Sequence, residues 1–232
     1  MSTTTYQAAA AASDTGLQAR RVLVFRALTL VAMVLLAAAY ISPVWWVSLK
    51  APNYPPETFP DGVRIHFHVD GVKNGCELRK NKEVVEDEAL DCVHEMNTIN
   101  HYIGMEPIEN GARFELAAAP YAFGLVGVML LAFLFYRGPF WWLLPIGGII
   151  VPAAFVADYS FWLWWFGHHL SPWGAFTVKP FMPTVFGEGK VAQFSTFSYP
   201  HYGFALMLAA AVVLILATLI RRKQLSEEAG RR

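Results

Sequence analysis

The stretch AAAPYAFGLVGVMLLAFLFYRGP, residues 117–139, decides the fold. Its first twenty residues, 117–136, carry no charge, and an uncharged apolar run of that length predicts a helix that crosses a bilayer. The connection Arg-Gly-Pro is so short that residues 139–166, which are also apolar, must return as the second helix of a hairpin. The stretch therefore predicts an α-helical integral membrane protein.

The rest of the chain extends this pattern to four transmembrane helices. Of its 232 residues, 55% are hydrophobic and 16% are charged, which is too apolar for an ordinary soluble domain. Predicted spans cover residues 22–49, 117–136, 139–166 and 202–220. Residues 50–116 and 167–201 form two long loops, and residues 1–21 and 221–232 form the two tails. We expect the loops to make a small mixed α/β extracytoplasmic region.

Positive charges indicate one orientation. Arg20, Arg21 and Arg26, then Arg137, then Arg221 to Lys223 all fall on one side of a four-span chain, and short loops rich in Lys and Arg stay in the cytoplasm. Both termini are therefore predicted to be cytoplasmic, with residues 1–21 as a disordered tail. No small-residue cleavage site follows the first span, which favours a retained anchor over a signal peptide.

Residues 90–105, LDCVHEMNTINHYIGM, hold the densest group of possible metal ligands. In a helix, His94, His101 and Met105 fall at i, i+7 and i+11 on one stripe. Imidazole with thioether is a ligand set that suits copper. The alternative is an interfacial helix whose His and Met side chains pack or face water. His101 with Met105 is the preferred pair, because i, i+4 spacing juxtaposes the two side chains.

A predicted strand, residues 63–70, places His66 and His68 on one face and apolar side chains on the other. His94 and His101 are about 10 Å apart along a helix axis, too far for one ion without a bend. We therefore expect His66 or His68 to approach the helix and complete a copper site, or two separate sites. All seven histidines of the chain lie in the two long loops.

Three further residues have predicted roles. Cys76 and Cys92, with no CxxC spacing, favour a structural disulfide in an oxidising compartment, with thiolate metal ligation as the alternative. Asp158 is a possible intramembrane acid, and a carboxylate in a bilayer usually has a partner or a function. The other interpretation of Asp158 is an interfacial acid that meets headgroups and water.

These residues carry a resemblance to a known family. The segment NTINHYIGM at 97–105, preceded by a Pro-rich lead and the strand GVRIHFHVD at 62–70, resembles small four-span bacterial membrane proteins associated with nitrous oxide reductase and other copper-enzyme systems. In the second loop, ADY at 157–159, GHHL at 167–170 and KPFMPTVFGEGKVAQFSTFSYP at 179–200 are similar to that family. The resemblance implies a multi-pass protein of the bacterial inner membrane with an accessory role in copper delivery to, or maturation of, an extracytoplasmic copper enzyme. The excursion from Cys76 to Cys92 is longer than the family's usual link.

The sequence favours a protein that is not an enzyme, since it contains no phosphate-binding glycine loop, CxxCH haem motif or HExxH zinc motif. The first functional hypothesis is a membrane-anchored accessory protein that handles copper. The second is a non-catalytic integral subunit that stabilises a larger membrane copper enzyme, such as a membrane-bound monooxygenase. The expected partners are the lipid bilayer and a copper enzyme or its assembly factors, in a hetero-oligomeric complex without nucleic acid.

Overall fold

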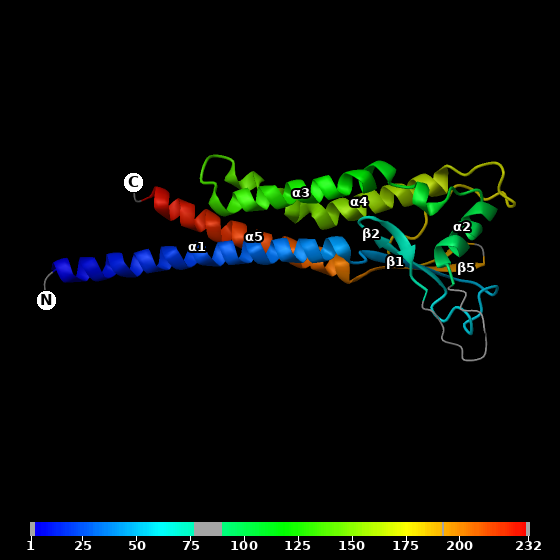
Figure 1. Ribbon diagram of the computed structural model, residues 1–232, viewed down its shortest axis with the longest axis horizontal. Coiled ribbons are helices and arrows are strands. Elements are labelled where there is room, and N and C mark those ends of the chain that lie inside the picture. The colour runs from blue at the N-terminus through cyan, green and yellow to red at the C-terminus, as the bar shows by residue number, and fades with distance from the viewer. Residues whose placement is uncertain (1–2, 77–89, 192, 231–232) are drawn as a thin grey trace. The chain divides into compact units, whose positions relative to one another are not determined.

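The computed structural model describes residues 3–76, 90–191 and 193–230. Its elements, in chain order, are α1 (Thr3–Ile41), β1 (Trp45–Lys50), β2 (Val63–His68), β3 (Gly71–Asn74), α2 (Cys92–Tyr102), η1 (Ile108–Asn110), α3 (Arg113–Phe135), η2 (Trp141–Leu143), α4 (Ile146–His168), β4 (Gly187–Val191), β5 (Phe194–Pro200) and α5 (Tyr202–Ala229). Figure 1 shows this order along the ribbon. The chain divides into two compact units, which are described separately: residues 1–37, 123–152 and 206–232, and residues 38–122 and 153–205.

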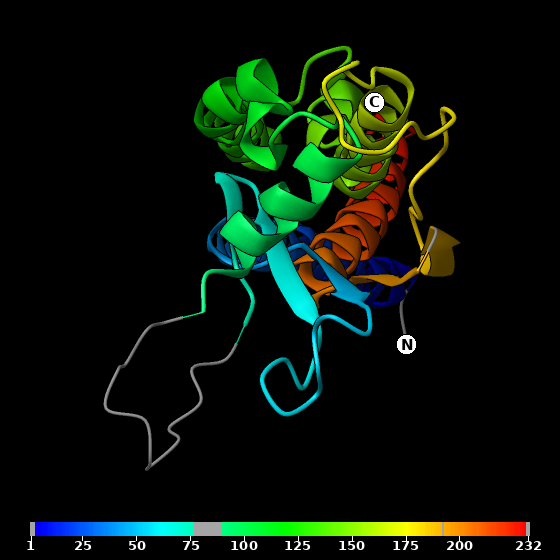
Figure 2. The ribbon, with the colours of Figure 1, turned by 90° about the vertical axis from the view of Figure 1, so that its right-hand side faces the viewer.

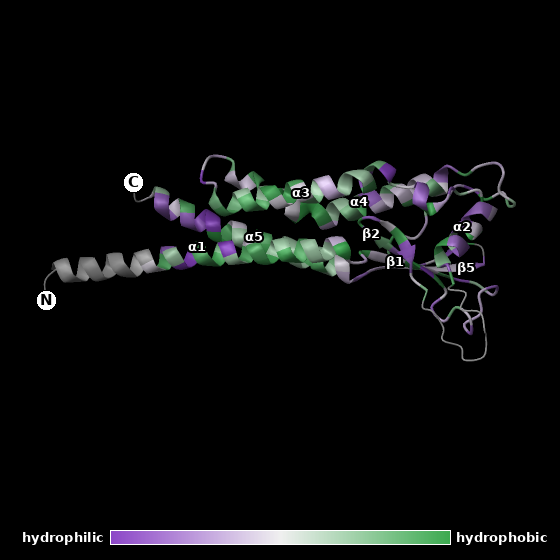
Figure 3. Cartoon of the chain, in the orientation of Figure 1, coloured by the Kyte–Doolittle hydropathy of each residue, from purple (hydrophilic) through white to green (hydrophobic). Residues whose placement is uncertain are grey.

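In the part of the chain that the structure describes, four helical segments are long and apolar enough to cross a membrane, as predicted. The candidate spans are Gly16–Ile41, Arg113–Phe135, Trp141–His168 and Tyr202–Ala229. Figure 3 shows hydrophobic residues along these helices and hydrophilic residues at the C-terminal end of α5. The boundaries differ from the predicted ones at the first and the last span, since α5 continues to Ala229, beyond the predicted end at residue 220. Helix α1 begins at Thr3, within the predicted disordered tail, and ends at Ile41.

The first unit is a helix bundle with a core of small and branched side chains. Its buried residues are Ala32 and Leu36 of α1, Leu130 of α3, and Ala210 and Leu214 of α5. The alanines let helix backbones approach closely, which is how helices associate in lipid. Towards the chain termini, the buried Arg221 donates to the backbone carbonyls of Phe133 and Tyr136. These bonds occupy carbonyls at the C-terminal end of α3, where the helix leaves them without partners of its own.

The second unit contains a five-stranded antiparallel sheet in the order β3-β2-β1-β5-β4. The central strand is β1, which the sequence analysis assigned to the end of the first span. Trp46 of β1 pairs with His66 of β2 on one side and with Tyr199 of β5 on the other. Residues 167–201, predicted to be a loop, therefore supply two of the five strands. We call the sheet together with α2 the sheet module.

Helix α2 packs against one face of this sheet (Figure 2). Val63 and Ile65 of β2 form a buried cluster with Cys92, Met96 and Ile99 of α2. Asp91 caps the start of α2, because its side chain accepts hydrogen bonds from the backbone N–H groups of Val93 at 3.0 Å and His94 at 3.1 Å. The predicted helix over 90–105 is shorter than expected. It ends before Gly104, whose φ of +78° suits glycine.

Two connections hold α2 to its surroundings in this unit. Cys76 and Cys92 form a disulfide with a Cα–Cα distance of 5.9 Å, in agreement with the predicted pairing; the chain between them, residues 77–89, lies outside the described residues. At the other end, the N–H of Ser171 donates to the carbonyl of Gly104 at 2.7 Å. The two loops predicted from the sequence are therefore in direct contact.

Candidate functional site

The predicted stripe of ligands on α2 divides between two environments. His94 and His101 lie on the exposed side of the helix, whereas Met105 is buried. The ring of His101 stacks on Trp173 with centroids 4.5 Å apart. Among the described residues, no group of three or more His, Cys, Asp or Glu side chains is placed to hold a metal ion.

Strand β2 turns His66 and His68 away from α2. Successive side chains of a strand point to opposite faces, and Val63 and Ile65 occupy the face that packs on α2. His66 and His68 therefore lie on the other face, as the predicted alternation requires. The structure does not bring either histidine to the helix histidines.

His66 meets a histidine that the sequence analysis did not include among its ligands. The rings of His66 and His201 have centroids 5.1 Å apart, at an interplanar angle of 64°. The position of His201 is fixed where β5 leaves the sheet, because its N–H donates to the carbonyl of Val44 at 2.9 Å. Pairing of β1 with both β2 and β5 is the reason that residues so distant in the sequence meet. We call His66, His68 and His201 the sheet-face histidines.

The sequence held only a weak signal for this arrangement. Tyr-Pro-His at 199–201 has no strand alternation of its own, and the register that places it next to β2 depends on β1. The predicted span 22–49 takes in all of β1 except Lys50, and it therefore leaves no strand to join β2 to β5. His201 was therefore recognisable only as one of seven loop histidines.

Arg64 and Tyr199 both contact Trp46, the residue that pairs with His66 in the sheet. The guanidinium of Arg64 lies 4.6 Å from the ring centroid of Trp46, and it pairs with Asp61 at 3.1 Å. Trp46 also contacts the ring of Tyr199, with centroids 5.3 Å apart. The cation of Arg64 opposes the binding of a metal ion, and the carboxylate of Asp61 offsets part of that charge.

Burial keeps the sheet-face histidines neutral. The pKa of His66 is lowered to about 4, first by burial and then by His201, Arg64 and His68. Burial is also the main cause that lowers the pKa of His68, where Lys73 adds to the effect and Asp70 opposes it, and the pKa of His201, where Arg64 adds to it. Neutral imidazole is the form that binds metals, so all three rings are in that form at pH 7.

Hydrogen bonding distinguishes the three rings. Nδ1 of His68 is buried and has no hydrogen-bond partner among the described residues, so it is a polar atom that a ligand would satisfy. Nδ1 of His201 accepts from the N–H of Tyr202 at 2.8 Å. Its Nε2 therefore carries the proton in the neutral form. For Nε2 to bind a metal, that proton must move to Nδ1, and this breaks the hydrogen bond from Tyr202.

The geometry permits an ion shared by two of these rings, those of His66 and His201. Two imidazole nitrogens that each lie about 2 Å from one metal are at most about 4 Å apart, and ring centroids 5.1 Å apart are compatible with that separation. His66 and His68 are two residues apart on one strand face, about 7 Å along the strand. Imidazole nitrogens bind copper, zinc and nickel ions.

A second pair of histidines lies at the end of α4. The rings of His168 and His169 stack on Trp164 and Trp165, with centroids 4.8 Å and 3.6 Å apart. Their Nδ1 atoms lie 2.8 Å and 2.9 Å from the carbonyls of the same tryptophans. A carbonyl only accepts, so both Nδ1 atoms donate and both Nε2 atoms keep a free lone pair in the neutral form.

No protein-family model, curated protein or solved structure matches this chain.

Asp158 lies in α4 and is half-buried. Its neighbour in the helix, Tyr159, is fully buried and contacts Ser198 of β5, with the two hydroxyl oxygens 3.2 Å apart. Ser198 also accepts from Nε1 of Trp45 at 2.9 Å. This polar chain fixes β5 relative to β1, and thereby the strand that leads to His201.

Proposed function

We propose that this chain is a membrane-anchored accessory protein that binds copper through the sheet-face histidines. The observation that carries the proposal is the meeting of His66 and His201, with His68 on the same strand face as His66 and its Nδ1 without a hydrogen-bond partner among the described residues. The ligand set moves from the predicted helix stripe to the opposite face of the sheet. The resemblance to copper-enzyme accessory proteins supports copper over zinc or nickel, and it supports delivery to an extracytoplasmic copper enzyme.

The residues have distinct tasks in this proposal. His66 and His68 present lone pairs from a strand whose other face is fixed in the core with α2. His201 joins as a ligand when it releases the N–H of Tyr202. A copper ion held by two or three neutral nitrogens keeps open positions, which is what transfer to a client requires.

Copper stoichiometry tests the proposal. The purified chain is loaded with Cu(I), freed of excess metal, and analysed by inductively coupled plasma mass spectrometry. We expect His66→Gln with His68→Gln to abolish stoichiometric copper, and His94→Gln with His101→Gln to leave it unchanged. The second pair is the matched control, because it removes two exposed imidazoles from α2.

The other outcomes are equally informative. Loss of copper only in the α2 variant would restore the predicted stripe and reject the sheet-face site. Copper that is absent from the native chain, or unchanged in both variants, would reject metal handling by these histidines altogether.

One observation favours the second candidate, a non-catalytic subunit of a larger copper enzyme. Four large apolar side chains of the segment between α4 and β5 are exposed outside the candidate spans: Trp173, Phe176, Met182 and Phe186. Exposed apolar groups of this kind occur at surfaces that contact a protein partner or a membrane. Chemical cross-linking in membranes distinguishes the candidates, since a structural subunit cross-links stoichiometrically through this segment and an accessory protein only transiently.

A further inference from the structure

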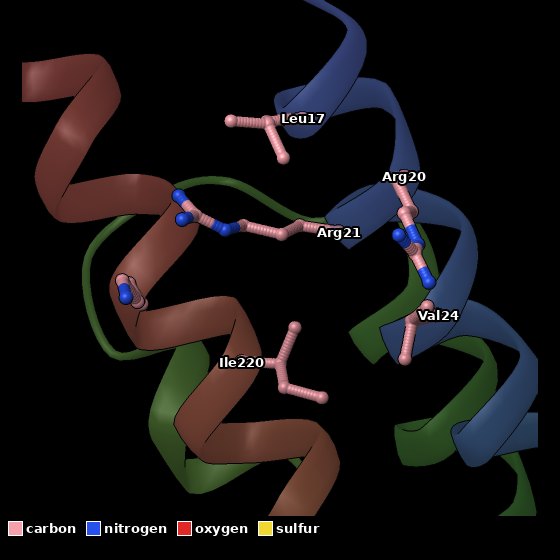
Figure 4. Close-up of a pocket in the computed structure, with 6 residues that line it drawn as sticks. Leu17, Arg20, Arg21, Val24 and Ile220 are labelled. Carbon is pink, nitrogen blue, oxygen red and sulfur yellow. The ribbon is translucent and has the colours of Figure 1, made fainter. Parts of the chain in front are cut away.

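A groove lies between α1 and α5 in the helix bundle. It has a volume of about 230 Å³ and is lined by Leu17, Arg20, Arg21 and Val24 of α1 and by Ile220 and Lys223 of α5. Figure 4 shows Leu17 and Ile220 on either side of the space that Arg21 enters from α1. Leu17 is the second residue of one candidate span, and Ile220 and Lys223 lie in the last third of another. The groove is therefore at an end of these spans, where headgroups meet acyl chains.

The lining combines two kinds of surface. Leu17 and Val24 are exposed although they are apolar, and Ile220 faces them across the groove. Three cations belong to the same lining, and one of them is already neutralised. Arg21 forms an ion pair with Glu227, which also accepts from Gln18 at 2.7 Å.

The other two cations have no such partner. Arg20 and Lys223 are exposed, and neither forms a salt bridge with a carboxylate among the residues whose side chains the structure describes. Two unpaired cations beside exposed apolar side chains complement a molecule that is anionic at one end and apolar at the other. A soluble anion such as phosphate would pair with the cations but would leave the apolar side chains uncovered.

We propose that this groove binds one anionic phospholipid. The headgroup phosphate lies between Arg20 and Lys223, and the upper part of an acyl chain covers Leu17, Val24 and Ile220. The pairing of Arg21 with Glu227 fixes α1 against α5 and leaves the net charge for the lipid to the two free cations. Basic pockets between helices at a membrane surface bind anionic headgroups in this way. The proposal is independent of the copper site, which uses none of these residues.

Native mass spectrometry of the full chain in detergent tests this inference. The protein is titrated with palmitoyl-oleoyl phosphatidylglycerol and, separately, with the zwitterionic phosphatidylcholine of the same chains. We expect one phosphatidylglycerol per chain at concentrations where phosphatidylcholine does not bind. Arg20→Gln with Lys223→Gln should weaken that binding about tenfold or more, because each cation near an anionic headgroup contributes separately.

The matched control is Arg137→Gln with Arg222→Gln. It removes the same formal charge from two exposed cations that do not line the groove, one of which, Arg137, pairs with Glu228 at 3.9 Å. Circular dichroism and gel filtration establish that both double variants fold. Equal loss of phosphatidylglycerol in the two variants would overturn the proposal in favour of general attraction to positive charge. Displacement of the lipid by millimolar inorganic phosphate would overturn it in favour of a phosphate site.

Discussion

The disulfide between Cys76 and Cys92 should set the local stability of α2. The two residues are 16 positions apart, and the chain-entropy model assigns about 3 kcal/mol to a disulfide that closes a loop of about 15 residues. Cys92 is fully buried in the core with Ile65 and Met96, so its replacement would also disturb packing. The clean perturbation is therefore Cys76→Ala, which opens the bridge and leaves the buried sulfur in place.

Hydrogen exchange measures the effect directly. A loss of about 3 kcal/mol should accelerate exchange of the α2 backbone amides roughly a hundredfold, since every 1.4 kcal/mol is a factor of ten. Reduction of the native chain should give the same acceleration, and reductant should change nothing further in Cys76→Ala. Unchanged α2 exchange in reduced protein, with both thiols titrated as free, would refute the reasoning.

Three further predictions concern the sheet module. Gly104→Ala should destabilise it by at least about 2 kcal/mol, because an added Cβ would lie 2.4 Å from the carbonyl oxygen of Ser171 at a φ of +78°; a thermal melt of Gly104→Ala that matches the native one would contradict this. Asp91→Ala removes the cap of α2 and should cost about 1 kcal/mol, seen as faster exchange in the first turn of α2 alone. The pKa of His66 is about 4 in the folded chain against about 6.5 when unfolded, so the unfolded state binds the extra proton between these values. Stability should therefore fall as pH falls from 6.5 to 4, and His66→Gln should show a smaller loss of melting temperature over that range; equal losses would argue against a buried, neutral His66.

The four spans were predictable because each is dominated by a long apolar run, in which Asp158 of the third span is the one acid. That signal depends only on neighbouring residues, and it correctly located the spans in α3 and α5. It failed at the end of the first span, where Trp45 and Trp46 resembled an aromatic anchor at the membrane surface but belong to the central strand of the sheet. Strand pairing of β1 with β5 joins residues about 150 positions apart, and no pattern within β1 indicates that β5 is its partner.

In the candidate site too, features set by neighbouring residues were predictable and features set by distant strand pairing were not. The alternation that put His66 and His68 on one strand face was readable from neighbouring residues, and so were the Asp91 cap and the pairing of Cys76 with Cys92. Which face of β2 would pack on α2 could not be predicted from neighbouring residues. Its apolar residues had to pack on the helix core, and this turned the histidines away from His94 and His101. The meeting of His66 with His201 needed the strand order of the whole sheet.

The central claim is that copper binds nitrogen ligands on the sheet face. Copper K-edge X-ray absorption of the loaded native chain tests it most directly. We expect a shell of imidazole nitrogens at about 2 Å without sulfur, by analogy with zinc distances, and the loss of that shell in His66→Gln with His68→Gln. A sulfur scatterer at about 2.3 Å, retained in that variant and lost in Met105→Leu, would contradict the account and return the site to the end of α2.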